Sequence, residues 1–283
     1  MGDAGHRAAA AVRRVTRVVD AFPFFNELEM LEIRLNVLDA VVDRFVLVES
    51  TVTFSGRPKP LWYADHRARF ARWADRIEHV IVDDSPDTGD DRWARERHQR
   101  DCVARGLASC RADDVVMLSD VDEIPDPSIV ATRRLGAYRQ RYSMYYLNAV
   151  QPRVRWVGTV ALYAFQLAAH GAEKVRLRRG SFEIVEGGGW HFAYAMPPDR
   201  IREKLGAFSH AEHDTPANAA AVETRRDALV DLFCAHPGQL VVEDIEGDRY
   251  PAYLREHWRR YASLVRQPFG GPDTVVVGAT APH

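Results

Sequence analysis

Three acidic side chains lie within four positions of one another in the segment VVMLSDVDEIP, residues 115–125. Asp120, Asp122 and Glu123 follow the apolar run 115–118 directly. If the strand continues, alternation sends Asp120 and Asp122 to the same face. Neighbouring carboxylates repel each other, and Mg²⁺ or Mn²⁺ would remove that repulsion because both ions prefer oxygen ligands. The segment therefore predicts a divalent-cation site whose coordination is completed by a substrate diphosphate.

Other phosphate-binding and metal-dependent classes find less support in the sequence. An Asp-x-Asp pair by itself also occurs by chance in solvated loops, so the preceding apolar strand is what favours a site. The chain contains no G-x-x-x-x-G-K-[ST] motif, which argues against a P-loop protein. No G-x-G-x-x-G follows the first expected strand, which weakens a dinucleotide-binding interpretation. A metal phosphoesterase is weakened by the lack of a histidine-rich two-metal constellation.

The elements that must position these acids alternate along the first half of the chain. Strands are expected at 15–22, 43–50, 77–84 and 113–125, and helices at 26–42, 67–77 and 91–110, with Asn26 as the first N-cap. The second half predicts strands within 142–158, 159–167, 174–180 and 181–195, some of them antiparallel, and a helical region at 198–234. Alternating strands and helices predict a mostly parallel sheet covered on both faces. Ligands bind beyond the carboxyl ends of such strands, where Glu49, Asp83, Asp84, Asp120 and Asp122 are expected.

Composition limits the class of protein. The chain has 283 residues, of which 46% are hydrophobic and 28% are charged, as in a soluble globular enzyme. A formal net charge of −2 argues against nucleic acid as the partner. The three cysteines show no C-x-x-C spacing, and no apolar run has the length of a membrane span. We expect a cytoplasmic protein.

Several segments together resemble a known family. FPFFNELEMLEIRLNVLDAVVDRFVLVES, TFSGRPKPL, VVMLSDVDEIP and GGWHFAYAMPPDRIREKL are similar to glycosyltransferase family 17, in the expected order and across approximately residues 18–240. The resemblance implies a GT-A-like fold with a central mixed, mostly parallel sheet, a UDP-GlcNAc donor, a divalent cation and inversion at the anomeric carbon. It leaves the acceptor open. We expect residues 1–14 to be disordered, 15–266 to form one catalytic domain, and 267–283 to form a loose tail.

The family pattern assigns roles to the acidic segment. Asp120 and Asp122 match the motif that holds metal and nucleotide, and we expect Asp122 to contact the cation and Asp120 the ribose or a metal-bound water. A late histidine often completes the metal shell in GT-A enzymes. His191, which follows three glycines, is the favoured candidate, and His210 competes with it. The ordinary alternative for either histidine is a structural role.

Further candidates come from residue chemistry. Glu96 and Arg100 are spaced four apart on the expected helix, so they form either a surface ion pair or, through Arg100, a contact to the diphosphate. Glu49 and Lys59 are candidates for donor binding, with Lys59 at the pocket rim between two prolines. Trp156 and Trp190 are candidate sugar platforms, although tryptophans more often pack in the core.

An inverting transfer also needs a general base for the acceptor hydroxyl. The candidates are Glu123, Glu183, Glu186, Glu212 and Asp214, and their spacing does not choose among them. The resulting prediction is a metal-dependent, inverting glycosyltransferase using Mn²⁺ or Mg²⁺. It moves N-acetylglucosamine from UDP-GlcNAc to a hydroxyl of a glycan or glycosylated natural product. The alternatives are a different UDP- or dTDP-sugar donor and a catalytically inactive carbohydrate-binding or scaffold protein.

Overall fold

Four parallel strands form one side of the central sheet. The computed structural model describes residues 16–89, 91–235 and 238–267. β1 (Val18–Phe24) lies between β2 (Arg44–Ser50) and β4 (Val115–Leu118), and β3 (Ile77–Val82) pairs with the outer edge of β2. β1, β2 and β4 are almost entirely buried, as expected for parallel strands covered on both faces. Their carboxyl ends therefore meet at one edge of the sheet.

The second half of the chain extends this sheet with mainly antiparallel pairs. β8 (Trp156–Tyr163) joins β4 to β6 (Gly136–Met144), and the path continues through β7 (Ala149–Val150) to β11 (Val241–Val242). β10 (Gly189–Ala193) runs parallel to β6 and antiparallel to the short β5 (Glu123–Pro125), while β9 (Ile184–Val185) also pairs with β6. The sheet is thus mixed.

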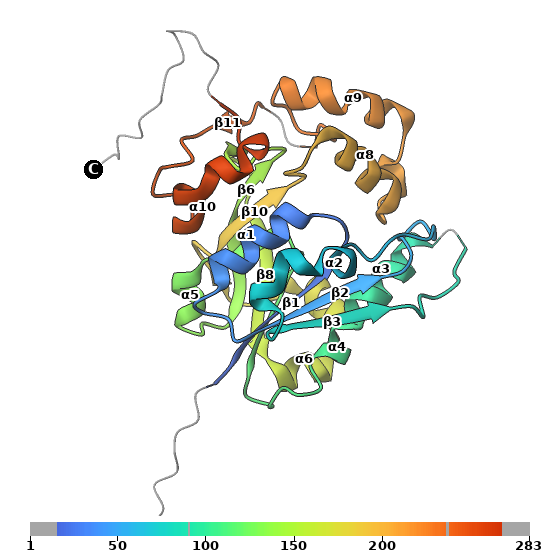
Figure 1. Cartoon of the computed structure of the whole chain (residues 1–283), viewed down its shortest axis with the longest axis vertical. Coiled ribbons are helices and arrows are strands. Elements are labelled where there is room, and N and C mark those ends of the chain that lie inside the picture. Colours follow the sequence, from blue (N-terminus) through green and yellow to red (C-terminus); the bar gives the residue numbers. More distant parts are fainter. Residues whose placement is uncertain (1–15, 90, 236–237, 268–283) are drawn as a thin grey trace, which may run out of the picture.

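Helices cover both faces of the sheet (Figure 1). One face carries α1 (Leu28–Leu38) and α10 (Ala252–His257), with Phe22, Phe45 and Leu254 in a shared core. The other carries α3 (Arg92–Asp101), α4 (Val103–Gly106), α6 (Ala164–His170) and α7 (Ala172–Leu177). The remaining helical elements are α2 (Trp62–Asp65), η1 (Arg67–Trp73), α5 (Pro127–Ala131), η2 (Arg179–Ser181), α8 (Pro198–Ala207), η3 (Ala211–His213), α9 (Pro216–Asp227) and η4 (Trp258–Leu264). The expected GT-A-like arrangement of a mixed sheet flanked by helices is confirmed.

Several expected elements differ in detail. The long strand expected at 113–125 is interrupted, because β4 ends at Leu118 and β5 begins at Glu123. The helix expected at 91–110 divides into α3 and α4, and the strand expected at 174–180 is wrong because α7 and η2 occupy that stretch. Asn26 is not the N-cap of α1; Glu27 holds that position without a capping hydrogen bond.

The terminal predictions fall mostly outside the described residues. The expected disordered segment 1–14 lies outside them, as does the expected loose tail apart from residue 267. Within the described ranges, no helix is both long and apolar enough to cross a bilayer.

Candidate active site

A tight turn between β4 and β5 carries the Asp-x-Asp pair, and one buried arginine holds this turn in place. Arg34, from α1, is fully buried and donates Nη1 to the carbonyl oxygens of Asp120, Val121 and Glu123, at 2.9, 3.1 and 2.9 Å. Its other nitrogens bind Asp20 in β1 at 2.7 and 2.6 Å. Asp120 and Asp122 therefore share a cavity because of the turn, and not because of the strand alternation that the sequence suggested.

The repulsion between the acids is relieved by the protein's own cations. Arg176, from α7, contacts Asp120 Oδ2 at 2.8 Å and also binds the carboxylate of Glu123. Arg100 Nη2 lies 3.8 Å from Asp120 Oδ1. Burial alone would raise the pKa of Asp120, but Arg176 and Arg100 outweigh that effect and lower it. A divalent cation is therefore not required to neutralise this cluster.

Asp122 faces a different pair of partners. His191 Nε2 lies 3.5 Å from its Oδ1, and Lys204 Nζ, from α8, lies 3.6 Å from its Oδ2. Burial would raise the pKa of Asp122, but Lys204 and His191 hold it far below its ordinary range. Burial would likewise lower the pKa of Lys204, and Glu27 at 2.8 Å together with Asp122 raises it instead. Asp122 is thus ionised and Lys204 is positively charged at neutral pH.

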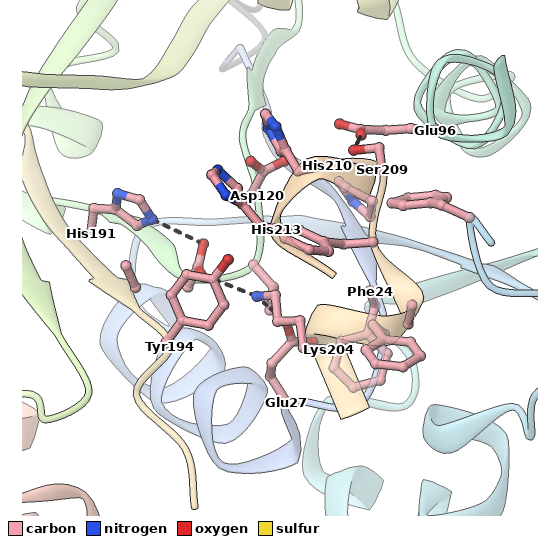
Figure 2. Close-up of a pocket in the computed structure, with 18 of the residues that line it drawn as sticks. Phe24, Glu27, Glu96, Asp120, His191, Tyr194, Lys204, Ser209, His210 and His213 are labelled. Carbon is pink, nitrogen blue, oxygen red and sulfur yellow. Dashed lines mark hydrogen bonds and ion pairs between the residues drawn. The ribbon is translucent and has the colours of Figure 1, made fainter. Parts of the chain in front are cut away.

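These side chains line a cavity of about 400 Å³ at the carboxyl edge of the parallel strands. Figure 2 shows His191 and Tyr194 on one side of this cavity and Glu96 with Ser209 on the other. The wall from the first half of the chain contains Phe24, Phe25, Phe54, Lys59, Gln99 and Arg100. The wall from the second half contains Tyr142, Trp156, His191, Tyr194, Lys204, Phe208, His210, His213, Asp231 and Phe233. Its size and mixed lining suit a small organic ligand with charged groups.

The donor set at Asp122 fits a hard divalent cation. Its carboxylate and the imidazole of His191 converge on one wall of the cavity, and such ions are commonly held by one or two carboxylates together with substrate phosphates. The ring of His191 is held by packing, with centroids 4.5 Å from Trp156 and 5.1 Å from Tyr142. Asp120, in contrast, is turned toward the arginines. Asp122 and His191 would therefore hold the ion.

The other predicted ligand-binding residues divide into two groups. Arg100 and Lys59 line the cavity, and Arg100 also pairs with Glu96 and Glu173. Glu49 is fully buried and absent from the cavity wall; it accepts from His79 at 3.0 Å and lies 3.7 Å from Lys59. This arrangement makes Glu49 a support for Lys59 and gives it no access to a bound nucleotide.

His210 lines the cavity but belongs to a separate group. Its Nδ1 lies 2.7 Å from Glu212 Oε1, and these two residues and His213 bring ligand atoms within 4.8 Å of one another. Asp120 and Asp122 are not members of that group. The two histidines proposed for one metal shell therefore have different acidic partners, and only His191 contacts the Asp-x-Asp turn.

None of the five predicted bases lines the cavity. Glu123 is fully buried, where its carboxylate accepts from Trp156 Nε1 at 2.8 Å and from the backbone N–H of Asp120 at 2.9 Å. Those contacts give Glu123 a positioning role beneath the turn. The other four are largely exposed and paired: Glu183 with Arg134, Glu186 with Arg139, Glu212 with His210, and Asp214 with Arg92.

Three site residues were not identified from the sequence. Arg34, Lys204 and Asp231 occupy helices and loops far from the acidic segment in sequence, so spacing carries no signal for them. Lys204 is the exception in one respect, because it is one of only three lysines in the chain and lies inside the segment that carries the family resemblance. Of the two candidate sugar platforms, Trp156 lines the cavity, whereas Trp190 is buried and donates Nε1 to the carbonyl oxygen of Arg249.

Comparisons with solved structures give only weak similarity. Glucosyl-3-phosphoglycerate synthase of M. tuberculosis covers 84% of this chain at 17% identity, with 92% of its own chain matched and a TM-score of 0.33. The apo form of glycosyltransferase GlyE of Streptococcus pneumoniae TIGR4 covers 89% at 13% identity, with 61% of its own chain matched and a TM-score of 0.31.

Sequence comparisons are more informative. β-1,4-mannosyl-glycoprotein 4-β-N-acetylglucosaminyltransferases of Rattus norvegicus and Homo sapiens are 25% and 27% identical over 93% of this chain. The chain spans 57% of the length of these relatives. The profile of Glycosyltransferase family 17 matches residues 6–234, which is most of the sequence. The chain belongs to glycosyltransferase family 17.

Proposed function

We propose that this protein transfers N-acetylglucosamine from UDP-GlcNAc to a hydroxyl group of a glycan or a glycosylated natural product. The transfer inverts the anomeric carbon and uses Mn²⁺ or Mg²⁺. The names of the curated relatives support N-acetylglucosamine as the sugar that is transferred. The observation that carries the proposal is the Asp122–His191 pair, which lines a ligand-sized cavity together with the cations Lys204 and Arg100.

The charges around the cavity support a diphosphate leaving group. Lys204 and Arg100 both line the cavity, and Lys59 adds a third cation whose pKa is lowered by burial although Glu49 opposes that shift. A bound divalent ion would neutralise the charge that develops on the departing diphosphate. Lys204 and Arg100 would act on the same charge from fixed positions, so little reorganisation is needed during the reaction.

Thermal unfolding with and without nucleotide tests the donor site. UDP with Mn²⁺ should raise the unfolding midpoint, and UDP with EDTA should raise it much less, because a ligand stabilises only by binding the folded state. A panel of UDP-GlcNAc, UDP-glucose, UDP-galactose and dTDP-glucose then identifies the donor through the size of the shift. The absence of any shift with all of these nucleotides and Mn²⁺ would contradict the proposal and favour a scaffold protein.

Transfer itself needs an acceptor assay. The acceptors are methyl β-mannoside, chosen because the relatives are named for a mannosyl acceptor, and a set of other methyl glycosides. We expect at least one of them to raise the rate of UDP release above that of donor hydrolysis. If the protein binds UDP with Mn²⁺ but neither transfers to any of these sugars nor hydrolyses the donor, the result would support the binding site and contradict the enzymatic function.

A further inference from the structure

Resting on the proposed function, we propose that Asp231 is the general base that removes the proton from the acceptor hydroxyl. Asp231 lines the cavity in the segment after α9, and its exposed fraction is only 3%. No feature of sequence spacing pointed to it. Three independent observations single it out: its lack of a cation, its fixed orientation, and its position relative to Asp122.

The first observation is its pairing. Five carboxylates line the cavity among the described residues, and four of them have cationic partners within 4.0 Å: Glu27 with Lys204, Glu96 with Arg100, Asp120 with Arg176, and Asp122 with Lys204. Asp231 has no such partner within the described part of the chain. A cation beside a carboxylate stabilises the charged form and weakens it as a base. Asp231 is therefore the cavity carboxylate that no cation of the described chain holds in an ion pair.

The second observation is the orientation of the carboxylate. Oδ1 accepts the backbone N–H of Phe233 at 2.8 Å and that of Ala235 at 3.1 Å. No described residue donates a hydrogen bond to the second oxygen, Oδ2. One oxygen thus anchors the group, and the other remains available to an acceptor hydroxyl.

The backbone around Asp231 is itself held against the sheet. Tyr145 donates its hydroxyl to the carbonyl oxygen of Val230 at 3.0 Å, and the N–H of Leu232 contacts Met144 Sδ at 3.3 Å. Leu229 and Cys234, on either side, have positive φ angles of 55°, which non-glycine residues rarely adopt. Strained backbone that is held by its surroundings is common at functional sites. These contacts fix the direction of the carboxylate.

The third observation is the position of Asp231 relative to Asp122, one of the two residues that would hold the divalent cation. Tyr142 and Tyr194 line the cavity, and the negative charges of both Asp122 and Asp231 act on each of them. Burial is the largest cause that raises the pKa of Tyr142, and the charge of Asp231 is the next. Asp122, Asp231 and the two tyrosines therefore line the same cavity. An acceptor bound in this cavity would share it with both carboxylates.

The proposed step balances simply. The acceptor oxygen forms a bond to the anomeric carbon while its proton moves to Asp231 Oδ2. The bond between the anomeric carbon and the diphosphate oxygen breaks, and its electron pair stays on the nucleoside diphosphate. Asp231 then loses the proton to water. No oxidant, reductant or further reactant is required.

The test compares D231N and D231A with the wild type and with D227N. The amide introduced by D231N retains an oxygen that can accept the two backbone N–H groups, so this variant should fold normally. Asp227 ends α9, is largely exposed, and provides a matched control at 4.0 Å from Arg266. UDP binding with Mn²⁺, measured calorimetrically, should change less than threefold in all variants. Hydrolysis of UDP-GlcNAc, in which water is the acceptor, should fall by about 10²- to 10⁴-fold in D231N and remain unchanged in D227N.

Azide separates a base from a structural residue. Because azide carries no proton to remove, D231N and D231A should form the glycosyl azide from UDP-GlcNAc at a rate within about tenfold of the wild type. Retention of hydrolysis by D231N, or failure of azide to restore turnover in variants that still bind UDP, would overturn the role of Asp231 alone. A wild-type protein with no turnover of UDP-GlcNAc would overturn the proposed function, and the role of Asp231 with it.

Discussion

The two ends of β4 both carry aspartates beside arginines, yet their surroundings differ. At the amino end, Asp114 is fully buried and binds the side chains of Arg17 and Arg111 at 2.6 and 2.8 Å. It also accepts the backbone N–H of each of these residues, at 3.1 and 2.8 Å. Its two oxygens are therefore fully occupied by the protein, and the cluster does not line the large cavity.

At the carboxyl end, the cations come from separate elements and both aspartates line the cavity. Arg100, Arg176 and Lys204 belong to α3, α7 and α8, and the side chain of Asp120 retains 38% of its exposure. Asp122 is contacted at 3.5 and 3.6 Å, which is longer than a normal charged hydrogen bond. The comparison teaches that a saturated ion cluster stabilises the fold, whereas an incompletely saturated one at an open cavity can exchange a partner for a ligand.

The largest expected effect is at Asp122. Asp122→Ala should reduce transfer by at least about 10³-fold and abolish the metal dependence of UDP binding, because it removes the carboxylate that faces His191. The free energy of unfolding should also fall, because the substitution removes one of the two carboxylates beside Lys204, so activity is compared once the variant is shown to be folded. Asp113→Ala, which removes an exposed aspartate beside the closed end of β4, is the control. Near-normal activity in the Asp122 variant would show that the charged cluster at the carboxyl end of β4 has no role in catalysis.

Arg176→Ala should affect both stability and activity, because Arg176 pairs with the buried Glu123 and also with Asp120, which lines the cavity. It is buried, and its removal leaves Glu123 and Asp120 without their closest cation. Breaking such a pair typically costs about 3–5 kcal/mol. Urea denaturation measures the loss, and Arg178→Ala, an exposed neighbour, should cost less than about 0.5 kcal/mol. Equal stabilities of the two variants would contradict the proposed pairing.

His191 and His210 provide a sharper comparison within the cavity. His191→Ala should weaken Mn²⁺-dependent UDP binding by at least tenfold, or about 1.4 kcal/mol. His210→Ala should weaken it much less, because His210 pairs with Glu212 and not with the Asp-x-Asp turn. Calorimetric titration of UDP at fixed Mn²⁺ measures both. The reverse order would move the cation to the group formed by His210, Glu212 and His213.

The smallest expected effect is on stability, and it concerns the pH dependence of Asp114 at the amino end of β4. Burial would raise the pKa of Asp114, but hydrogen bonds from Arg17 and Arg111 lower it to about 2, below the ordinary 3.8. Its contribution to stability is therefore present above about pH 4 and is lost as the pH falls toward 2. Allowing for solvent screening of the arginines, that contribution is about 1–2 kcal/mol.

Asp114→Asn should lose this amount at pH 7 and show a flatter decline in stability between pH 4 and 2. Its activity should stay within twofold of the wild type. Unfolding midpoints measured across that pH range test the first expectation, and a transfer assay at neutral pH tests the second. A large loss of activity without a loss of stability would mean that the two ends of β4 are not separate in function.

The parallel half of the fold could be predicted closely, because buried strands and their helices leave a clear hydrophobic pattern. The expected strand at 43–50 agrees with β2 to within one residue at its start. The antiparallel half was predicted less well, since short strands such as β5 and β9 are defined by partners distant in sequence. The stretch 174–180 illustrates the limit, because its alternating apolar residues fitted a strand although tertiary contacts of Arg176 hold it as a helix.

The residues of the site also divide into those that could be predicted from the sequence and those that could not. Asp120 and Asp122 were recognisable because their chemistry is local to one strand end. Glu123 was chosen by proximity in sequence, and its burial against Trp156 and Arg176 could not be read from spacing. Asp231 lies more than one hundred residues from the acidic segment, so only the folded chain places it at the same cavity.

The hydrogen bonds from Arg34 to the Asp-x-Asp turn have an evolutionary consequence. Since the same guanidinium also binds β1 and Ser119, the side of the cavity that carries Asp120 and Asp122 is built into the central sheet. Descendants of this chain could not alter that side without rebuilding their core.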